Sequence, residues 1–220
     1  SKRKDPEAAV SYLLKIGYPP QAILVYLMSI ANSNFEEWTL SNHSFDVDKF
    51  PFSFSKMSLD GALFDEGKLN WFSKETMALI PTKDLVPEVT KWAKANDAAS
   101  MAKIEADPAY FSRILGIERD RPNPRKDYAR YQDIEPAIRF FYEEDYAKIV
   151  ANGLPFNPRY SASFLEKFLG DMAEKMRYGV SESEWWNSVK EVASQDGFAI
   201  SNKDYKANPS AYQGSVSDAA

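Results

Sequence analysis

Apolar residues return at steps of three and four along most of this chain, the spacing that buries one face of an α-helix. The pattern is clearest after Pro20 and again after Thr82. The first stripe contains Ala22, Ile23, Tyr26, Leu27, Ile30 and Ala31, and the second contains Leu85, Val86, Val89, Trp92 and Ala93. We therefore predict helices over residues 20–31 and 82–96, with an earlier helix over residues 6–16 completing a helical hairpin.

Capping signals predict the remaining helices. These begin at Asp107-Pro108, at Glu135-Pro136, near Phe164, and at Ser181, which with Glu184 fits a capping box. Ser73 and Thr82 are further N-cap candidates. Between residues 33 and 60 the helical period is lost among Phe, Pro, Ser and Asn, so we predict that this stretch is irregular.

Strand signals are too sparse for a sheet, and the predicted fold class is therefore all-α. We expect two regions, residues 1–82 and residues 83–220, because a helix ends at Pro81 and a new one begins directly after it. A further boundary is expected near residues 153–158, a stretch that contains Gly153, Pro155 and Pro158.

The composition excludes several kinds of site. The chain has 220 residues, a net charge of -5, no cysteine and a single histidine. Disulfides and thiolate metal sites are excluded, and we expect no transition metal held by the protein, with His43 an exposed loop residue. Neither a membrane span nor a secretory signal is indicated, so we expect a cytoplasmic location. Acidic runs such as Glu143-Glu144-Asp145 are interpreted as solvated helix faces.

One stretch is locally basic. Residues 113–130 contain Arg113, Arg119, Arg121, Arg125, Lys126 and Arg130 against Glu118, Asp120 and Asp127, and they carry Tyr128 with Tyr131 directly after. Cations bind phosphates, and aromatic rings or guanidinium planes stack on unpaired bases, so the stretch is a candidate RNA contact. The other interpretation is a loop closed by its own salt bridges. An RNA-binding role predicts that residues 113–130 keep an open face.

Several segments resemble bacterial, class I glutamyl-tRNA synthetases, and together they cover essentially the whole chain. Ser1-Lys2-Arg3 looks like the end of the family's Lys-Met-Ser-Lys-Ser type signature. The other similar segments are Gly17-Tyr18-Pro19-Pro20-Gln21-Ala22-Ile23, the run from Ser58 to Asp65, Lys68-Leu69-Asn70-Trp71, Pro124-Arg125-Lys126-Asp127-Tyr128 and Gln213-Gly214-Ser215-Val216.

The resemblance implies a tRNA-binding portion of that enzyme, which joins glutamate to its tRNA with ATP and Mg²⁺. Residues 1–82 would follow the signature loop as the stem-contact region, and residues 83–220 would be a helical anticodon-binding region. Ser1, Lys2 and Arg3 would belong to the ATP loop, or else form a solvated terminus. The partner would be tRNA for glutamate, and we expect a monomer.

The resemblance also implies the tRNA-binding residues. Arg125 would recognise an anticodon base, a role suited to a planar guanidinium. The same basic region would supply Arg121, Lys126 and Arg130, with Tyr128 and Tyr131 offering stacking faces. In the stem-contact match, Lys68 and Trp71 would touch the tRNA backbone, or Trp71 would instead pack the joint between the two regions.

The family's nucleotide-binding domain, with its His-x-Gly-His signature, has no counterpart here, since His43 is followed by Ser44-Phe45. We therefore expect a piece truncated at both ends, with no catalytic residue and no aminoacylation of its own. The alternative from another class is a non-enzymatic helical module that binds a protein partner. A complete enzyme is disfavoured, because no nucleophile, metal set or phosphate-binding loop is apparent.

Overall fold

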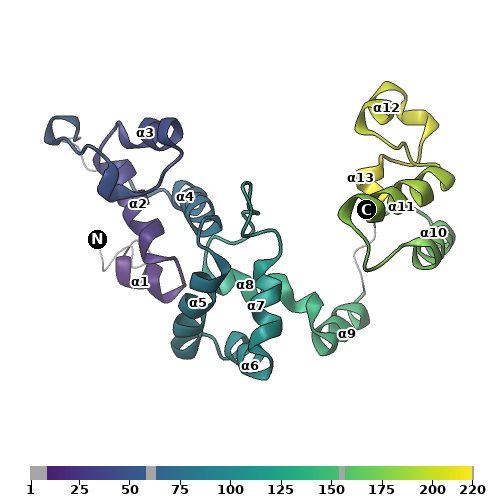
Figure 1. The fold of residues 1–220 in the computed structure, drawn as a ribbon, viewed down its shortest axis with the longest axis horizontal. Helices are drawn as coiled ribbons and strands as arrows, with labels where there is room; N and C mark the ends of the chain where they lie inside the picture. Colours follow the sequence, from purple (N-terminus) through teal and green to yellow (C-terminus); the bar gives the residue numbers. More distant parts are fainter. Residues whose placement is uncertain (1–8, 58–62, 154–156, 220) are drawn as a thin grey trace. The chain divides into compact units, whose positions relative to one another are not determined.

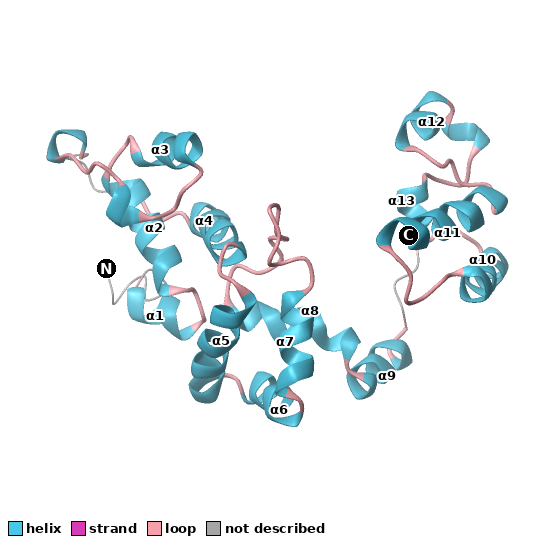
Figure 2. Cartoon of the chain, viewed as in Figure 1, coloured by secondary structure: helices cyan, strands magenta, loops and turns pink. Residues whose placement is uncertain are grey.

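The computed structural model describes residues 9–57, 63–153 and 157–219. These residues form thirteen α-helices and several short 3₁₀ helices, and none of them belongs to a β-strand (Figures 1 and 2). The all-α prediction is confirmed. The chain divides into two compact units, Ser1–Asn152 and Gly153–Ala220. Within the described residues, no helix has the length and apolar character needed to cross a bilayer.

The first unit contains nine α-helices within its described part. Their bounds are α1 Val10–Lys15, α2 Pro20–Ala31, α3 Phe35–Asn42, α4 Glu66–Ala78, α5 Thr82–Asn96, α6 Ala98–Ala106, α7 Pro108–Gly116, α8 Ile134–Ile138 and α9 Glu143–Ala151. The 3₁₀ helices are η2 Val47–Lys49, η3 Phe54–Lys56, η4 Tyr131–Asp133 and η5 Arg139–Phe141.

The N-terminal half of this unit is built on α2 and α4. The predicted helix after Pro20 is confirmed, with proline at its first position, where no backbone N–H is needed. Its buried stripe packs with Leu69 and Phe72 of α4 around a core that also holds Tyr18 and Phe35. Helix α3 lies where we predicted irregular structure, and that prediction was wrong for residues 35–42.

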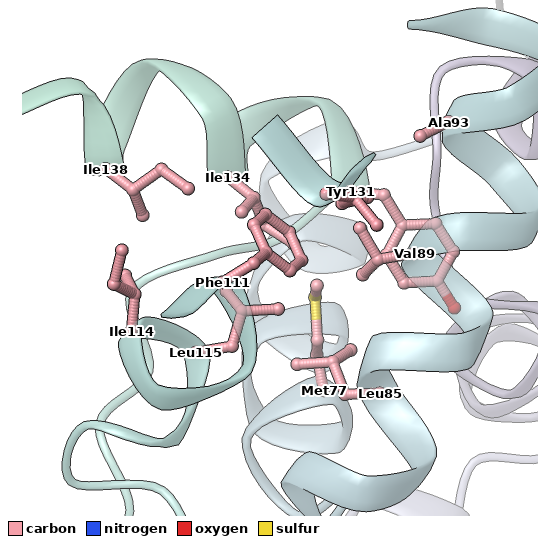
Figure 3. Packing of buried hydrophobic residues seen from close by; sticks show 11 residues of the cluster. Met77, Leu85, Val89, Ala93, Phe111, Ile114, Leu115, Tyr131, Ile134 and Ile138 are labelled. Carbon is pink, nitrogen blue, oxygen red and sulfur yellow. The ribbon is translucent and has the colours of Figure 1, made fainter. Parts of the chain in front are cut away.

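A second core surrounds α5 and α7. Leu85 and Val89 of the predicted stripe are fully buried against Phe111 and Leu115 of α7 (Figure 3). Ile134 and Ile138 of α8 close the same core. Asp107 caps α7 as expected, since its carboxylate accepts from the Tyr110 N–H at 2.8 Å.

The two cores meet at the turn after α1. The Tyr131 N–H donates to the Gly17 carbonyl at 2.8 Å, and the Trp92 indole N–H donates to the Lys15 carbonyl at 2.9 Å. The Ser73 hydroxyl donates to the Ala129 carbonyl at 2.5 Å from inside α4. The prediction that Ser73 is an N-cap was therefore wrong, and the N-cap of α4 is Asp65.

The second unit has its own core. Its helices are α10 Ala162–Lys175, α11 Glu182–Gln195, α12 Asn202–Ala207 and α13 Val216–Ala219, with the 3₁₀ helix η6 Pro209–Ala211. Phe168 of α10 packs on Val189 and Val192 of α11. Both bonds of the predicted Ser181–Glu184 capping box are present. An isolated parallel bridge joins Ala199 to Ser215.

Candidate nucleic-acid interface

The basic stretch forms a loop that leaves the end of α7. Glu118 turns the chain out of the helix with a φ of 53°, and its carbonyl accepts from the Arg125 N–H at 3.1 Å. This bond closes the loop at its base. The loop itself projects beyond the end of α7 (Figure 1). From Pro124 to Tyr128 the backbone has no helical bonding, so neighbouring side chains can point to opposite sides.

One side of the loop faces a groove. Pro124 and Lys126 line a hollow of about 290 Å³ together with Trp71 of α4 and Leu40 of α3. The Lys126 ammonium donates to the Glu75 carboxylate at 2.7 Å, while its side chain stays 51% exposed. Trp71 and Lys126, which belong to different predicted regions, therefore border the same groove.

The other side of the loop faces a pocket. Arg125, Asp127 and Tyr128 line a hollow of about 330 Å³ whose opposite wall comes from α7 and the 3₁₀ helix η5. Arg125 makes two parallel bonds to Asp127, with Nε–Oδ2 at 2.9 Å and Nη2–Oδ1 at 3.0 Å. These bonds raise the pKa of Arg125 further, so the guanidinium stays charged. Burial raises the pKa of the Tyr128 phenol.

Each of the four predicted basic contacts of this region has a carboxylate partner. The pairs are Arg121–Glu118 at 3.0 Å, Arg125–Asp127 at 2.9 Å, Lys126–Glu75 at 2.7 Å and Arg130–Asp133 at 2.9 Å. The loop is thus salt-bridged, as the competing interpretation required, but it also keeps an open face, because the Arg125 side chain is 58% exposed. Arg130 is the least open of the four and lies over the Tyr18 ring at 5.8 Å.

Tyr131 does not offer a stacking face in this structure. Its side chain is 4% exposed within the α5 and α7 core, and its hydroxyl donates to the Glu88 carboxylate at 2.6 Å. Burial, strengthened by that bond, raises the pKa of Tyr131 far above its usual value. The expectation that both tyrosines stack on bases is corrected here, and only the half-buried Tyr128 borders an open pocket.

Lys68 and Trp71 lie on α4. The Lys68 ammonium donates to Glu36 of α3 at 2.8 Å, which links the two helices. Trp71 is 41% exposed and meets Phe72 and Phe45 edge to face, with ring centroids 4.8 Å and 6.5 Å away. Trp71 therefore packs against Phe45, in the loop that follows α3, and keeps an open surface in the groove.

Comparison with known proteins shows which proteins this chain resembles. No family model and no solved structure matches the chain. The glutamate–tRNA ligase of Acetivibrio thermocellus is 37% identical over 218 residues, 99% of this chain and 39% of that protein. Those of Clostridium perfringens strain 13 and Sorangium cellulosum are each 34% identical, over 100% and 99% of the chain and 40% and 38% of their own lengths. The chain corresponds to a segment of glutamate–tRNA ligases.

The chain spans about 40% of the length of these glutamate–tRNA ligases. Ser1, Lys2 and Arg3, which the family resemblance assigns to the ATP loop, lie outside the described residues. The described residues bring together no group of three or more His, Cys, Asp or Glu side chains able to hold a metal ion.

The sequence alone does not distinguish two residues of the pocket beside Arg125. Arg119 resembles the other arginines of the basic stretch, yet it is buried and lines the pocket. Phe140 is exposed and lines the same pocket. The Phe140–Phe141 pair carried a signal, because two consecutive bulky apolar residues cannot both face the core from one short helix.

Proposed function

We propose that this chain is the tRNA-binding portion of a glutamate–tRNA ligase and that its partner is tRNA for glutamate. The observation that carries the proposal is the match to such ligases along 99% or more of the chain. The geometry supports it, because the segment from Pro124 to Tyr128 holds Arg125 and Lys126 at the borders of two open hollows. In the parent protein, glutamate would be attached to the tRNA with ATP and Mg²⁺.

The proposed division of labour follows the two predicted regions. Residues 1–82 would contact the tRNA stem through Lys68 and Trp71, and residues 83–220 would bind the anticodon side. The shared groove supports a continuous RNA path from α4 to the basic loop, since Trp71 and Lys126 both border it. Phosphates would be bound by the cations, and unpaired bases by the aromatic and guanidinium planes.

The described residues bind and orient in this proposal, and they take no part in bond formation. Any contact with ATP would come from residues 1–3, and the described residues supply no clustered ligands for Mg²⁺. We accordingly expect no charging of tRNA by the chain alone, because adenylate formation depends on an oriented nucleotide and carboxylate. We place the parent protein in the cytoplasm, where translation uses its product, and propose that it acts as a monomer.

The test is direct binding of fluorescently labelled tRNA for glutamate, followed by anisotropy at several salt concentrations. The Lys126→Ala variant should weaken binding and reduce the slope of log affinity against log salt by about one. Lys49→Ala is the matched control, because Lys49 is also an exposed lysine paired with a carboxylate, Asp46, at 3.0 Å. It should leave the slope unchanged.

Arg125→Ala should reduce the preference for tRNA for glutamate over a non-cognate tRNA, since a guanidinium fork discriminates base edges by about 1–3 kcal/mol. The proposal is wrong if the unmodified chain shows no preference for this tRNA at low salt. It is also wrong if Arg125→Ala and Lys126→Ala both bind as the unmodified chain does.

A further inference from the structure

Helix α4 holds the basic loop at both ends. Where the loop begins, the Arg119 guanidinium donates through Nη1 to the Met77 carbonyl at 2.7 Å. Where it ends, the Ser73 hydroxyl donates to the Ala129 carbonyl at 2.5 Å. Ser73 and Met77 are about one turn apart on α4. A single turn of this helix therefore fixes both ends of the segment 119–129.

Arg119 ties the end of α7 to the end of α4. The residue is 6% exposed, and its Nε donates to the Leu115 carbonyl at 3.1 Å in the last turn of α7. Its Nη1 also donates to the Ile80 carbonyl at 3.4 Å, in the turn between α4 and α5. The last carbonyls of a helix lack partners within it and carry partial negative charge, so they compensate the buried cation. Because each of these acceptors is a main-chain atom, Arg119 fixes the backbone and not a mobile side chain.

Asp120 adds a second connection at the same place. Its carboxylate accepts from the N–H of Thr82, the first residue of α5, at 3.1 Å. The first N–H groups of a helix have no partner within it, and the preceding Pro81 has no side chain that can accept one. Gly116 lies against the same threonine, since an added Cβ would be 3.5 Å from its Oγ1. The turn between α4 and α5 is therefore held against the start of the loop by two successive residues.

The surface contacts of the loop cannot replace these buried bonds. Lys126 pairs with Glu75 of α4 at 2.7 Å, but its side chain is 51% exposed. An exposed ion pair contributes little to stability, and an RNA phosphate competes with the carboxylate for the lysine. The bonds that Arg119 and Ser73 make to main-chain carbonyls are buried. They therefore hold the loop on α4 when Lys126 turns toward a ligand.

We propose that Arg119 is a positioning residue for RNA binding, which joins Trp71 of α4 and Arg125 of the loop into one rigid body. The RNA then meets both contacts at a preset spacing, and neither contact has to be ordered when the complex forms. A second contact held rigidly at the correct span also binds at a high effective concentration. An RNA whose two contact points are spaced differently gains only one of the contacts. The inference rests on the proposed function, which supplies the RNA and assigns Trp71 and Arg125 to its binding.

Arg119→Met removes the guanidinium donors and keeps much of the side-chain volume. Affinity for tRNA for glutamate, measured by anisotropy, should fall about 10- to 100-fold, because the released loop must be ordered again on binding. Lys103→Met is the matched control, since Lys103 is a cation of the same unit that is only 13% exposed and pairs with Glu135 and Asp145. It should bind as the unmodified chain does. Urea unfolding verifies that both variants are folded at the assay temperature.

A distance measurement separates positioning from direct contact with the RNA. The chain contains no cysteine, so two introduced cysteines can carry nitroxide labels without interference. Glu66→Cys at the start of α4 and Asn123→Cys in the loop replace exposed residues, and pulsed electron paramagnetic resonance reports the distance between the labels. The distribution of distances should be narrow in the otherwise unmodified chain and broad with Arg119→Met, before any RNA is added. With Lys103→Met it should stay narrow.

Ser73→Ala tests the other end of the loop with a smaller change. It removes the hydroxyl that bonds the Ala129 carbonyl, so it should broaden the distribution and weaken tRNA binding, each less than Arg119→Met does. Ser29→Ala is its control, because the Ser29 hydroxyl is also buried in a helix but donates to the Tyr26 carbonyl of that same helix at 2.7 Å. It should change neither measurement. This pair decides the question if Arg119→Met does not fold.

The inference is wrong if Arg119→Met and Lys103→Met bind tRNA with equal affinity. It is also wrong if Arg119→Met weakens binding while the distribution stays narrow, because Arg119 would then contact the RNA itself. A broad distribution with unchanged affinity overturns it too, since freeing the loop would then cost the complex nothing. Failure of the proposed function is seen separately, when the unmodified chain shows no preference for tRNA for glutamate at low salt. The distance measurement, which needs no RNA, still reports whether Arg119 holds the loop.

Discussion

Substituting Gly17 tests the joint between the two cores of the first unit. Gly17 turns the chain between α1 and α2 with a φ of +95°, a conformation that glycine adopts without strain. An added Cβ would lie 3.0 Å from the Tyr131 N, 3.1 Å from the Gln132 N and 3.1 Å from Trp92 Cε2. The backbone cannot simply move away, because the Tyr131 N–H already donates to the Gly17 carbonyl at 2.8 Å.

Gly17→Ala should therefore cost about 2–3 kcal/mol of the free energy of unfolding. The left-handed backbone contributes about 1–2 kcal/mol and the overpacking about 1–3 kcal/mol, and the reduced entropy of the unfolded chain offsets about 0.4–1 kcal/mol. Gly179→Ala is the control, because Gly179 has a φ of +73° with no atom within 4 Å of the added Cβ. It carries the backbone cost alone, about 1 kcal/mol.

The assay is urea unfolding together with hydrogen exchange of the peptide that contains the Tyr131 amide. A loss of 2–3 kcal/mol corresponds to exchange about 30- to 150-fold faster wherever exchange requires opening of the joint. If Gly17→Ala costs no more than Gly179→Ala, the close approach of the two backbones is not a constraint. The contact between the two cores at Gly17 would then tolerate an added methyl group despite its hydrogen bonds.

Three further substitutions follow from buried or capping contacts. Tyr131→Phe should lose about 1.5–3 kcal/mol in thermal unfolding, because its hydroxyl bonds the Glu88 carboxylate, and tRNA affinity by anisotropy should stay unchanged. Lys103→Met should lose about 1–3 kcal/mol in urea unfolding, because Lys103 donates to Glu135 at 3.2 Å and to Asp145 at 2.5 Å, while Glu135 keeps its pair with Arg139 at 2.7 Å; an unchanged free energy of unfolding would contradict this. Ser181→Ala should lose about 0.5–2 kcal/mol from the second unit, measured by hydrogen exchange of α11, since it removes the capping hydroxyl.

Local signals in the sequence predicted the helices whose stability is local. Helices α2, α5, α7 and α11 have an apolar stripe, a cap or a proline at the start, and each of these features acts within a few residues. Helix α3 has no such stripe, because only Phe35 and Thr39 are buried. Phe35 packs against Phe50, with ring centroids 5.0 Å apart, so its burial depends on a segment outside the helix.

The candidate site was predicted only as a set of residue types. The sequence predicts Tyr128 and Tyr131 together as stacking faces. Tyr131 is instead buried in the core around α5 and α7, where its hydroxyl donates to Glu88, 43 residues earlier in the chain. Arg119 and Arg125 look alike in sequence, yet one is fixed beneath the pocket by carbonyls of α4 and α7 and the other lies at its rim. Such differences arise from tertiary contacts that no local pattern encodes.

The ion pairs of the basic loop are compatible with RNA binding, because they orient the cations at little cost. An exposed pair contributes only about 0.2–1 kcal/mol to stability, so a phosphate or base edge can replace or join the carboxylate easily. Arg125 uses Nε and Nη2 for Asp127, which leaves Nη1 with no acceptor among the described residues. The pair also fixes the plane of a side chain that otherwise loses about 2 kcal/mol of rotamer entropy on binding. If the chain binds tRNA as proposed, this arrangement would confine RNA affinity in an acidic chain to the few positions where an RNA group fits the preset geometry.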